Sequence, residues 1–147
     1  MITAKDLYLT YDSNKYIIKR GNFSIKEKEF VFTGGNSGSG KSTLLKSFYG
    51  DIPIKHGSLK ISNQEVFKIK GNNLRYLRKD IGVIFQDYKL INDYTIEENI
   101  MIPLKINNYS DEVSRLQADN LLKHVKLSHR KGFYPNQLSG GEQQRVA

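Results

Sequence analysis

The sequence predicts an α/β fold whose first part is rich in strands and whose second part is helical. An apolar run at Phe30–Phe32 is followed by a glycine-rich stretch and then by a helical pattern, which gives the order strand, loop, helix. After Gln86 the strand-like alternation changes to helical periodicity. At 147 residues the chain has the size of one domain. The expected organisation is one domain over 1–147, with an α/β core over 1–86 and a helical subdomain over 87–147.

Several short segments of the first part have the pattern of strands. Phe30–Phe32 and Ile81–Phe85 are compact apolar runs, which are typical of strands buried on both faces. Ser58–Ser62 alternates between apolar and polar residues after a turn expected at 55–57. The expected strands cover residues 2–11, 16–18, 23–25, 30–32, 58–62 and 81–85.

Two helices are expected in the first part. One covers 41–49 and ends at Gly50, and the other covers 72–79. The apolar face of the first consists of Leu44, Leu45 and Phe48.

Capping signals mark the helices of the second part. Thr95 and Glu98 fit a capping box, in which a hydroxyl and a carboxylate satisfy free amides of the first turn. Ser110 is expected to cap a further helix. The apolar face of that helix is expected to contain Val113, Leu116, Leu121 and Val125.

The stretch Gly35–Ser42 matches the phosphate-loop pattern G-x-x-x-x-G-K-S/T. A triphosphate needs several backbone amides at close range, and glycines such as Gly38 and Gly40 let the chain wrap that tightly. Lys41 offers a positive charge to the β- and γ-phosphates, and Ser42 offers a hydroxyl to Mg²⁺. A flexible turn is the alternative, but the strand before the motif and the helix after it favour a P-loop that binds ATP. The expected ATP-binding residues are Gly35, Asn36, Ser37, Gly38, Ser39, Gly40, Lys41, Ser42 and Thr43.

Composition narrows the class of protein further. Apolar residues make up 38% of the chain, and no apolar run reaches the roughly 20 residues of a membrane-spanning helix. The start lacks the features of a signal peptide and the chain has no cysteine, so we expect a cytoplasmic protein. The net charge of +8 comes mostly from scattered lysines, which indicates solvated faces or an anionic partner rather than a nucleic acid.

A second concentrated motif is Leu138–Arg145, which reads LSGGEQQR. Ser139, Gly140 and Gly141 lead into a helix, so that amides, a hydroxyl and a helix dipole would face outward as a second anion site. A serine-capped helix after a proline turn explains these residues equally well.

Together, the phosphate loop and this motif resemble the ABC ATPase family over essentially the whole chain. The resemblance implies a RecA-like P-loop NTPase core with an antiparallel β-subdomain and a helical subdomain. Tyr11 stands where the family has an aromatic that stacks on adenine, and Gln86 where the Q-loop glutamine contacts Mg²⁺ and the attacking water. Ser139, Gly140 and Gly141 match the signature, which reaches the γ-phosphate held by the opposite subunit. The resemblance therefore also implies a head-to-tail homodimer with two ATP molecules between its subunits.

The resemblance also implies roles and partners. Lys41 and Gln86 would be the catalytic side chains, and Ser42 and Gln86 the Mg²⁺ ligands. The stretch 77–91 is similar to the FtsE group of cell-division ATPases, with ATPases of lipoprotein-release and macrolide exporters as the alternative. An FtsE-type subunit would act with an FtsX-type transmembrane partner at the cytoplasmic face of the bacterial inner membrane.

The family's remaining catalytic motifs are not in this sequence. The chain ends inside the signature helix, before the expected Walker B strand, and no histidine follows such a strand. We expect this chain to bind ATP without turnover, and a full-length version to hydrolyse it. Phe30–Phe32 should then lack strand neighbours and be exposed. The alternative is a regulatory module that binds nucleotide without catalysis.

Overall fold

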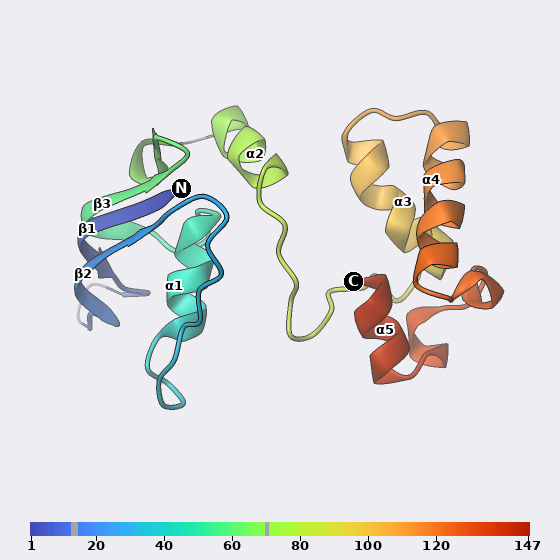
Figure 1. Cartoon of the computed structure of the whole chain (residues 1–147), viewed down its shortest axis with the longest axis horizontal. Helices are drawn as coiled ribbons and strands as arrows, with labels where there is room; N and C mark the ends of the chain where they lie inside the picture. Colours follow the sequence, from blue (N-terminus) through green and yellow to red (C-terminus); the bar gives the residue numbers. More distant parts are fainter. Residues whose placement is uncertain (13–14, 70) are drawn as a thin grey trace. The chain divides into compact units, whose positions relative to one another are not determined.

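The computed structural model describes residues 1–12, 15–69 and 71–147. The chain divides into two compact units, Met1–Gly82 and Val83–Ala147, and each has a hydrophobic core of its own. Figure 1 shows strands with helices α1 and α2 in the first unit, and helices α3, α4 and α5 in the second. None of the described helices is both long enough and apolar enough to cross a membrane.

The first unit is built on a four-stranded antiparallel sheet in the order β2-β1-β3-β4. Its elements are β1 (Ile2–Leu9), β2 (Ile18–Ile25), β3 (Ile54–Ile61), β4 (Gln64–Glu65) and the 3₁₀ turn η1 (Val66–Lys68). Ala4, Leu7 and Leu59 are buried in the core, whereas Lys5 and Lys60 are exposed. Strand β2 contains the strand expected at 23–25 but only Ile18 of the strand expected at 16–18, so that shorter prediction was wrong at residues 16 and 17.

The prediction of a turn at 55–57 was wrong, because β3 continues through these residues. Gly57 has φ 84°, and it lies where the register between β1 and β3 shifts. A Cβ atom at Gly57 would lie 2.0 Å from the carbonyl oxygen of Asp6. The segment is a bulge in a continuous strand, and the glycine allows the two backbones to approach each other closely.

Helix α1 (Lys41–Phe48) packs on the core of the first unit. Leu44 and Phe48 contact that core, whereas Leu45 is 51% exposed, so its predicted place on the buried face was wrong. Leu45 lies about 100° around the helix from Leu44, which is enough to turn it away from the sheet. Helix α2 (Asn72–Lys79) has the predicted bounds.

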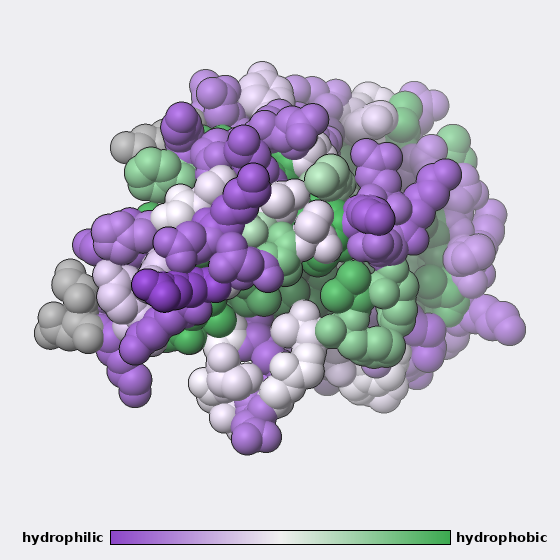
Figure 2. All heavy atoms as spheres, turned by 60° about the vertical axis from the view of Figure 1, so that its left-hand side comes forward, coloured by the Kyte–Doolittle hydropathy of each residue, from purple (hydrophilic) through white to green (hydrophobic). Residues whose placement is uncertain are grey.

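Two apolar runs that were predicted as buried strands, Phe30–Phe32 and Ile81–Phe85, are not strands. Within the described residues neither run pairs with a neighbouring strand. Phe30 is 84% and Phe32 is 85% exposed. A buried strand needs a ladder partner for its backbone and a layer over each face, and the described residues supply neither here. Figure 2 shows apolar residues at the surface beside hydrophilic ones on the face drawn.

The second unit consists of helices joined by short turns. Its elements are α3 (Ile96–Ile106), α4 (Asp111–His124), η2 (Ser128–Arg130), η3 (Pro135–Gln137) and α5 (Gly140–Val146). The buried core consists of Ile96, Leu122, Leu127 and Leu138. The predicted caps are confirmed, because Thr95 and Glu98 form a capping box at α3 and the Ser110 hydroxyl caps α4.

The apolar face predicted for α4 was wrong except at Val125, which packs against the core of the second unit. Leu116 and Leu121 are 61% and 50% exposed, and the buried residues of the helix are Ser114, Ala118 and Leu122. These three residues follow each other at intervals of four, so they share one side of the helix. Two of them are small, and a pattern search for large apolar residues therefore identifies the adjacent side instead.

Candidate nucleotide-binding site

The phosphate loop is built from glycines whose backbone angles other residues rarely adopt. Gly38 has φ 78° and Gly40 has φ 94°, both in the left-handed region. A Cβ atom at Gly40 would lie 2.7 Å from Cγ2 of Ile17, so this position has no room for a side chain. The chain turns from Gly40 directly into α1, which begins at Lys41. The local sequence thus brings the loop backbone to the start of a helix.

Lys41 lies over the loop that precedes it. Its Nζ donates hydrogen bonds to the carbonyl oxygens of Gly35, at 2.7 Å, and Asn36, at 2.8 Å. The Ser39 N–H donates to the Asn36 carbonyl at 3.2 Å, which closes the loop further. Phosphate oxygens are stronger acceptors for an ammonium group than neutral carbonyls are. Lys41 is therefore held where it can exchange these two bonds for a phosphate.

The start of α1 has no negative charge of its own. No acidic residue stands in its first turn, and its N-cap, Gly40, has no side chain that could accept an amide hydrogen bond. The first turns of α3, α4 and α5 contain the acidic residues Glu97, Glu98, Asp111, Glu112 and Glu142. Residues 1–82 carry fifteen Lys and Arg against seven Asp and Glu, while residues 83–147 carry eight of each. The helix dipole and the charge of the first unit both favour an external anion at α1.

The structure brings Tyr11 to the side of α1. The Thr43 hydroxyl donates a hydrogen bond to the Tyr11 hydroxyl at 3.4 Å, and Tyr11 is 60% exposed. Thr43 is buried, so it supports the tyrosine from a fixed position. Ser42 is exposed in the first turn of the same helix. Tyr11, Lys41, Ser42 and the loop thus come together in one unit.

Gln86 lies in the second unit, where it is exposed. The segment that follows it is fixed by Asn99, which the sequence analysis missed. The Asn99 Nδ2 donates to the carbonyl oxygens of Ile91, Tyr94 and Thr95 at 3.0, 3.1 and 2.9 Å. Its Oδ1 accepts the N–H of Ile91 at 2.7 Å. The side chain therefore ties the segment after Gln86 to helix α3.

The three signature residues also lie in the second unit. Ser139 is the N-cap of α5, Gly140 and Gly141 are its first residues, and all three are exposed. The Glu142 carboxylate accepts the N–H and the hydroxyl of Ser139, each at 2.8 Å. The Ser139 oxygen in turn accepts the N–H of Glu142 at 3.4 Å. This capping box closes the helix start with a carboxylate of the chain itself.

Arg130 binds the other side of the Glu142 carboxylate. Its Nε lies 3.1 Å from Oε1 of Glu142, and its guanidinium lies 4.8 Å from the centroid of the Phe133 ring. The hydrogen bonds from Ser139, the backbone one first, and then Arg130 lower the pKa of Glu142 to about 2. The sequence analysis missed both residues. The spacing S-x-x-E identifies Glu142, whereas the contact with Arg130 arises only from the fold.

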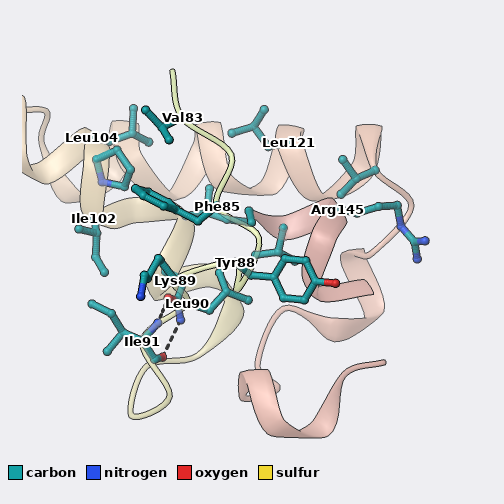
Figure 3. Close-up of a pocket in the computed structure, with 16 residues that line it drawn as sticks. Val83, Phe85, Tyr88, Lys89, Leu90, Ile91, Ile102, Leu104, Leu121 and Arg145 are labelled. Atoms are coloured by element: carbon teal, nitrogen blue, oxygen red, sulfur yellow. Dashed lines mark hydrogen bonds between the residues drawn. The ribbon is translucent and has the colours of Figure 1, made fainter. Parts of the chain in front are cut away.

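A cavity of about 590 Å³ lies within the second unit. Figure 3 shows that its lining comes from the segment 83–91 and from helices α3, α4 and α5. The apolar lining residues include Val83, Phe85, Leu90, Ile91, Ile102, Leu104, Leu121 and Val125. Lys89 and Arg145 are charged residues of the lining. A mostly apolar hollow with a few charges suits an apolar segment of a partner chain.

Known proteins resemble this chain over its full length. The cell division ATP-binding protein FtsE of Streptococcus pneumoniae serotype 2 is 35% identical over 147 residues, which cover 100% of this chain and 64% of that protein. The methionine import ATP-binding protein MetN of Clostridium tetani is 38% identical over 151 residues, which cover 100% of this chain and 46% of that protein. The chain therefore spans less than two thirds of the length of these relatives.

Solved structures resemble it as well. The dimeric ATP-binding cassette MJ0796 in a post-hydrolysis state with ADP and Pi matches with a TM-score of 0.87 and 38% identity, over 99% of this chain and 66% of that one. The profile of the family described as ABC transporter matches residues 18–147, which include the phosphate loop, Gln86 and the signature. The expected P-loop fold with its antiparallel and helical parts is thereby confirmed. The chain belongs to the ABC transporter family and has the fold of its ATP-binding subunits.

Proposed function

We propose that this protein binds MgATP through its phosphate loop and, as a full-length subunit, hydrolyses it to drive a transmembrane partner. The position of Lys41 carries the proposal, because its ammonium group lies over the loop at a helix start without acidic residues. The charge, the loop amides and the helix dipole are all offered to one anion. A nucleotide triphosphate is the anion that this loop pattern binds.

The side chains of the site have separate roles. Lys41 contacts the β- and γ-phosphates, and Tyr11, which is exposed beside α1, offers its ring to adenine. Ser42 and Gln86 would hold Mg²⁺ together with phosphate oxygens, which suits an ion that usually takes few ligands from the protein. Gln86 also orients the attacking water. Phosphoryl transfer then depends on positioning and electrostatic stabilisation.

The proposed active form is a head-to-tail homodimer with two ATP molecules at its interface. Ser139, Gly140 and Gly141 would contact the γ-phosphate of the ATP that the opposite subunit holds. Their exposure at the start of α5 supports this role. The dimeric state of the similar cassette MJ0796 with ADP and Pi supports the dimer.

Cell division with an FtsX-type partner is the specific context that we propose, at the cytoplasmic face of the bacterial inner membrane. Relatives named FtsE that are 35% identical over the whole chain support it. The apolar cavity beside the Gln86 segment is the surface where the partner would dock. Methionine import is the competing context, because relatives named MetN are 36–38% identical. The ATPase of a lipoprotein-release or macrolide exporter is the third context.

The substitution Lys41→Ala tests ATP binding directly. Loss of a charged hydrogen bond costs about 1.5–3 kcal/mol, so the affinity of the full-length protein for a fluorescent ATP analogue should fall about 10- to 100-fold. Lys46→Ala is the matched control, since Lys46 stands in the last turn of the same helix. Equal affinity of the Lys41→Ala variant and the unaltered protein would contradict the proposal. Binding without phosphate release by the full-length protein would indicate a regulatory module.

Co-purification with membrane proteins of its own cell tests the proposed partner. The full-length protein should recover an FtsX-type subunit, and Leu104→Asp, which places a charge in the apolar cavity, should abolish the recovery. Lys126→Asp introduces the same residue at an exposed position outside the cavity lining and serves as its control. Recovery of a methionine permease or an exporter permease would replace the cell-division context.

A further inference from the structure

The first turn of α5 is occupied by the protein's own carboxylate. Oε2 of Glu142 accepts two hydrogen bonds from Ser139, one from its N–H and one from its hydroxyl, each at 2.8 Å. A hydroxyl has a single hydrogen to donate, and in this arrangement it points to Glu142. A phosphate oxygen that accepts this hydrogen must therefore replace the carboxylate as its acceptor.

Arg130 changes the charge that an approaching phosphate would meet. Its Nε lies 3.1 Å from Oε1 of Glu142, with the two side chains only 31% and 17% exposed. The ring of Phe133 supports the guanidinium at 4.8 Å. Partly buried charge pairs are screened by salt less than exposed ones. Arg130 thus neutralises much of the negative charge of Glu142 from the side opposite Ser139.

Helix α3 contains the same capping box and serves as an internal comparison. Oε2 of Glu98 accepts the N–H and the hydroxyl of Thr95 at 2.7 and 2.8 Å. Among the described residues, Glu98 forms no salt bridge. The box by itself is explained by helix stability, which both helices require. The contact with Arg130 is what distinguishes α5, and a cap does not require it.

We propose that Glu142 competes with the γ-phosphate for the Ser139 hydroxyl, and that Arg130 is the positioning residue that limits this competition. The inference rests on the proposed function, in which Ser139 contacts ATP bound by the opposite subunit. In the separate subunit the hydroxyl donates to Glu142. In the ATP-bound dimer it turns to the phosphate, while the carboxylate keeps its bonds to the Ser139 N–H and to Arg130. Glu142 thereby weakens dimerisation and favours separation once the phosphate has left.

Two substitutions change the competition in opposite directions. Glu142→Gln removes the charge and keeps an oxygen for the Ser139 N–H, so ATP-driven dimerisation should tighten about tenfold, the value of one charge-assisted hydrogen bond. Arg130→Ala leaves the full carboxylate charge facing the phosphate and should weaken dimerisation about tenfold. Arg130→Lys keeps a cation beside Glu142, so its dimerisation should be nearly as tight as that of the unaltered protein. In the Glu142→Gln background, Arg130→Ala should change the dissociation constant by less than about twofold, because no charge is left to neutralise.

Sedimentation equilibrium of the full-length protein with Mg²⁺ and ATPγS measures these dissociation constants. Glu98→Gln is the matched control and should leave dimerisation unchanged. Weaker dimerisation with Glu142→Gln, or equal effects of Arg130→Ala in both backgrounds, would overturn the inference and leave a purely structural contact.

Ser139→Ala separates this inference from the function on which it rests. If this variant dimerises as tightly as the unaltered protein, the proposed contact of the signature with ATP is wrong. If it dimerises more weakly but Glu142→Gln does not tighten the dimer, the signature contact holds and only the competition is wrong. Thermal unfolding of each variant establishes that it is folded.

Discussion

Helices α1 and α5 both have a small residue as N-cap, but their free amides are satisfied in opposite ways. At α1 the N-cap is Gly40, the first turn has no acidic residue, and within the described part of the chain Lys41 bonds to loop carbonyls alone. At α5 the N-cap is Ser139, and Glu142 fills the first turn. One helix start is left open to a foreign anion, whereas the other already has an anion of its own. The start of α1 can therefore take an anion directly, whereas at α5 an anion that binds the Ser139 hydroxyl must first replace Glu142 as its acceptor.

Placing a carboxylate at the start of α1 should make it resemble α5. Ser42→Asp adds an acidic residue to the first turn, which repels the triphosphate while it favours the helix dipole. The ATP affinity of the full-length protein should fall by about 100-fold, which corresponds to about 2.7 kcal/mol. Ser42→Ala is the control for the lost hydroxyl. Titration with a fluorescent ATP analogue measures both variants, and equal affinities would show that the charge at this helix start is unimportant.

Adding a side chain at Gly40, the N-cap of α1, should destabilise the first unit. Gly40→Ala forces a Cβ atom toward Ile17 at a φ of 94°, and strain of this kind with its clash costs about 2–3 kcal/mol of unfolding free energy. Gly34→Ala is the control, because its Cβ would have no atom within 4 Å. Urea denaturation measures the difference. A Gly40→Ala variant as stable as Gly34→Ala would contradict the close approach.

Removing the cap of α3 should affect stability alone. Thr95→Ala loses the side-chain acceptor of the capping box and should cost about 1 kcal/mol of unfolding free energy. Because α3 supplies none of the side chains proposed to contact ATP or Mg²⁺, ATP affinity should not change. Denaturation and nucleotide titration on the same sample measure the two quantities. A loss of ATP affinity would show that this cap also serves the site.

Lowering the pH should protonate the Glu142 carboxylate of α5 and so destabilise the fold. The hydrogen bonds from Ser139, and then Arg130, lower the pKa of Glu142 from 4.5 to about 2. A lowered pKa in the folded state means that the charged group stabilises the fold above pH 4.5, and that this stabilisation is lost as the pH falls toward 2. The unaltered protein should thus lose more thermal stability than Glu142→Gln between pH 5 and pH 2.5. Equal losses of thermal stability in the two proteins would contradict the lowered pKa of Glu142.

Local signals in the sequence predicted the parts of the fold that depend on neighbouring residues. The capping box at Thr95, the cap at Ser110 and the bounds of α2 are confirmed, since a cap or a short helix is specified within a few residues. The glycines of the phosphate loop belong to the same class, because their backbone angles follow from the loop itself.

Features that depend on distant residues were not predictable in this way. Phe30–Phe32 has the composition of a buried strand, but a strand forms only against partners. The separate expectation that this run would lack strand neighbours and be exposed is confirmed among the described residues. The buried side of α4 was missed because Ser114 and Ala118 are small, so that packing rather than hydrophobicity selects that side. The ion pair of Arg130 with Glu142 joins residues from two separate elements, and no spacing pattern in the sequence predicts it.

The absence of a side chain at Gly57 has an evolutionary consequence. Asp6 and Gly57 must remain in contact for the sheet to keep its alignment, so the first ten residues cannot slide along β3 without a collision. Every replacement at position 57 should be purged in a selection for folded protein, while its exposed neighbour Lys60 should accept many. The route that the chain takes from its first residue to Tyr11 should thus depend on this one glycine.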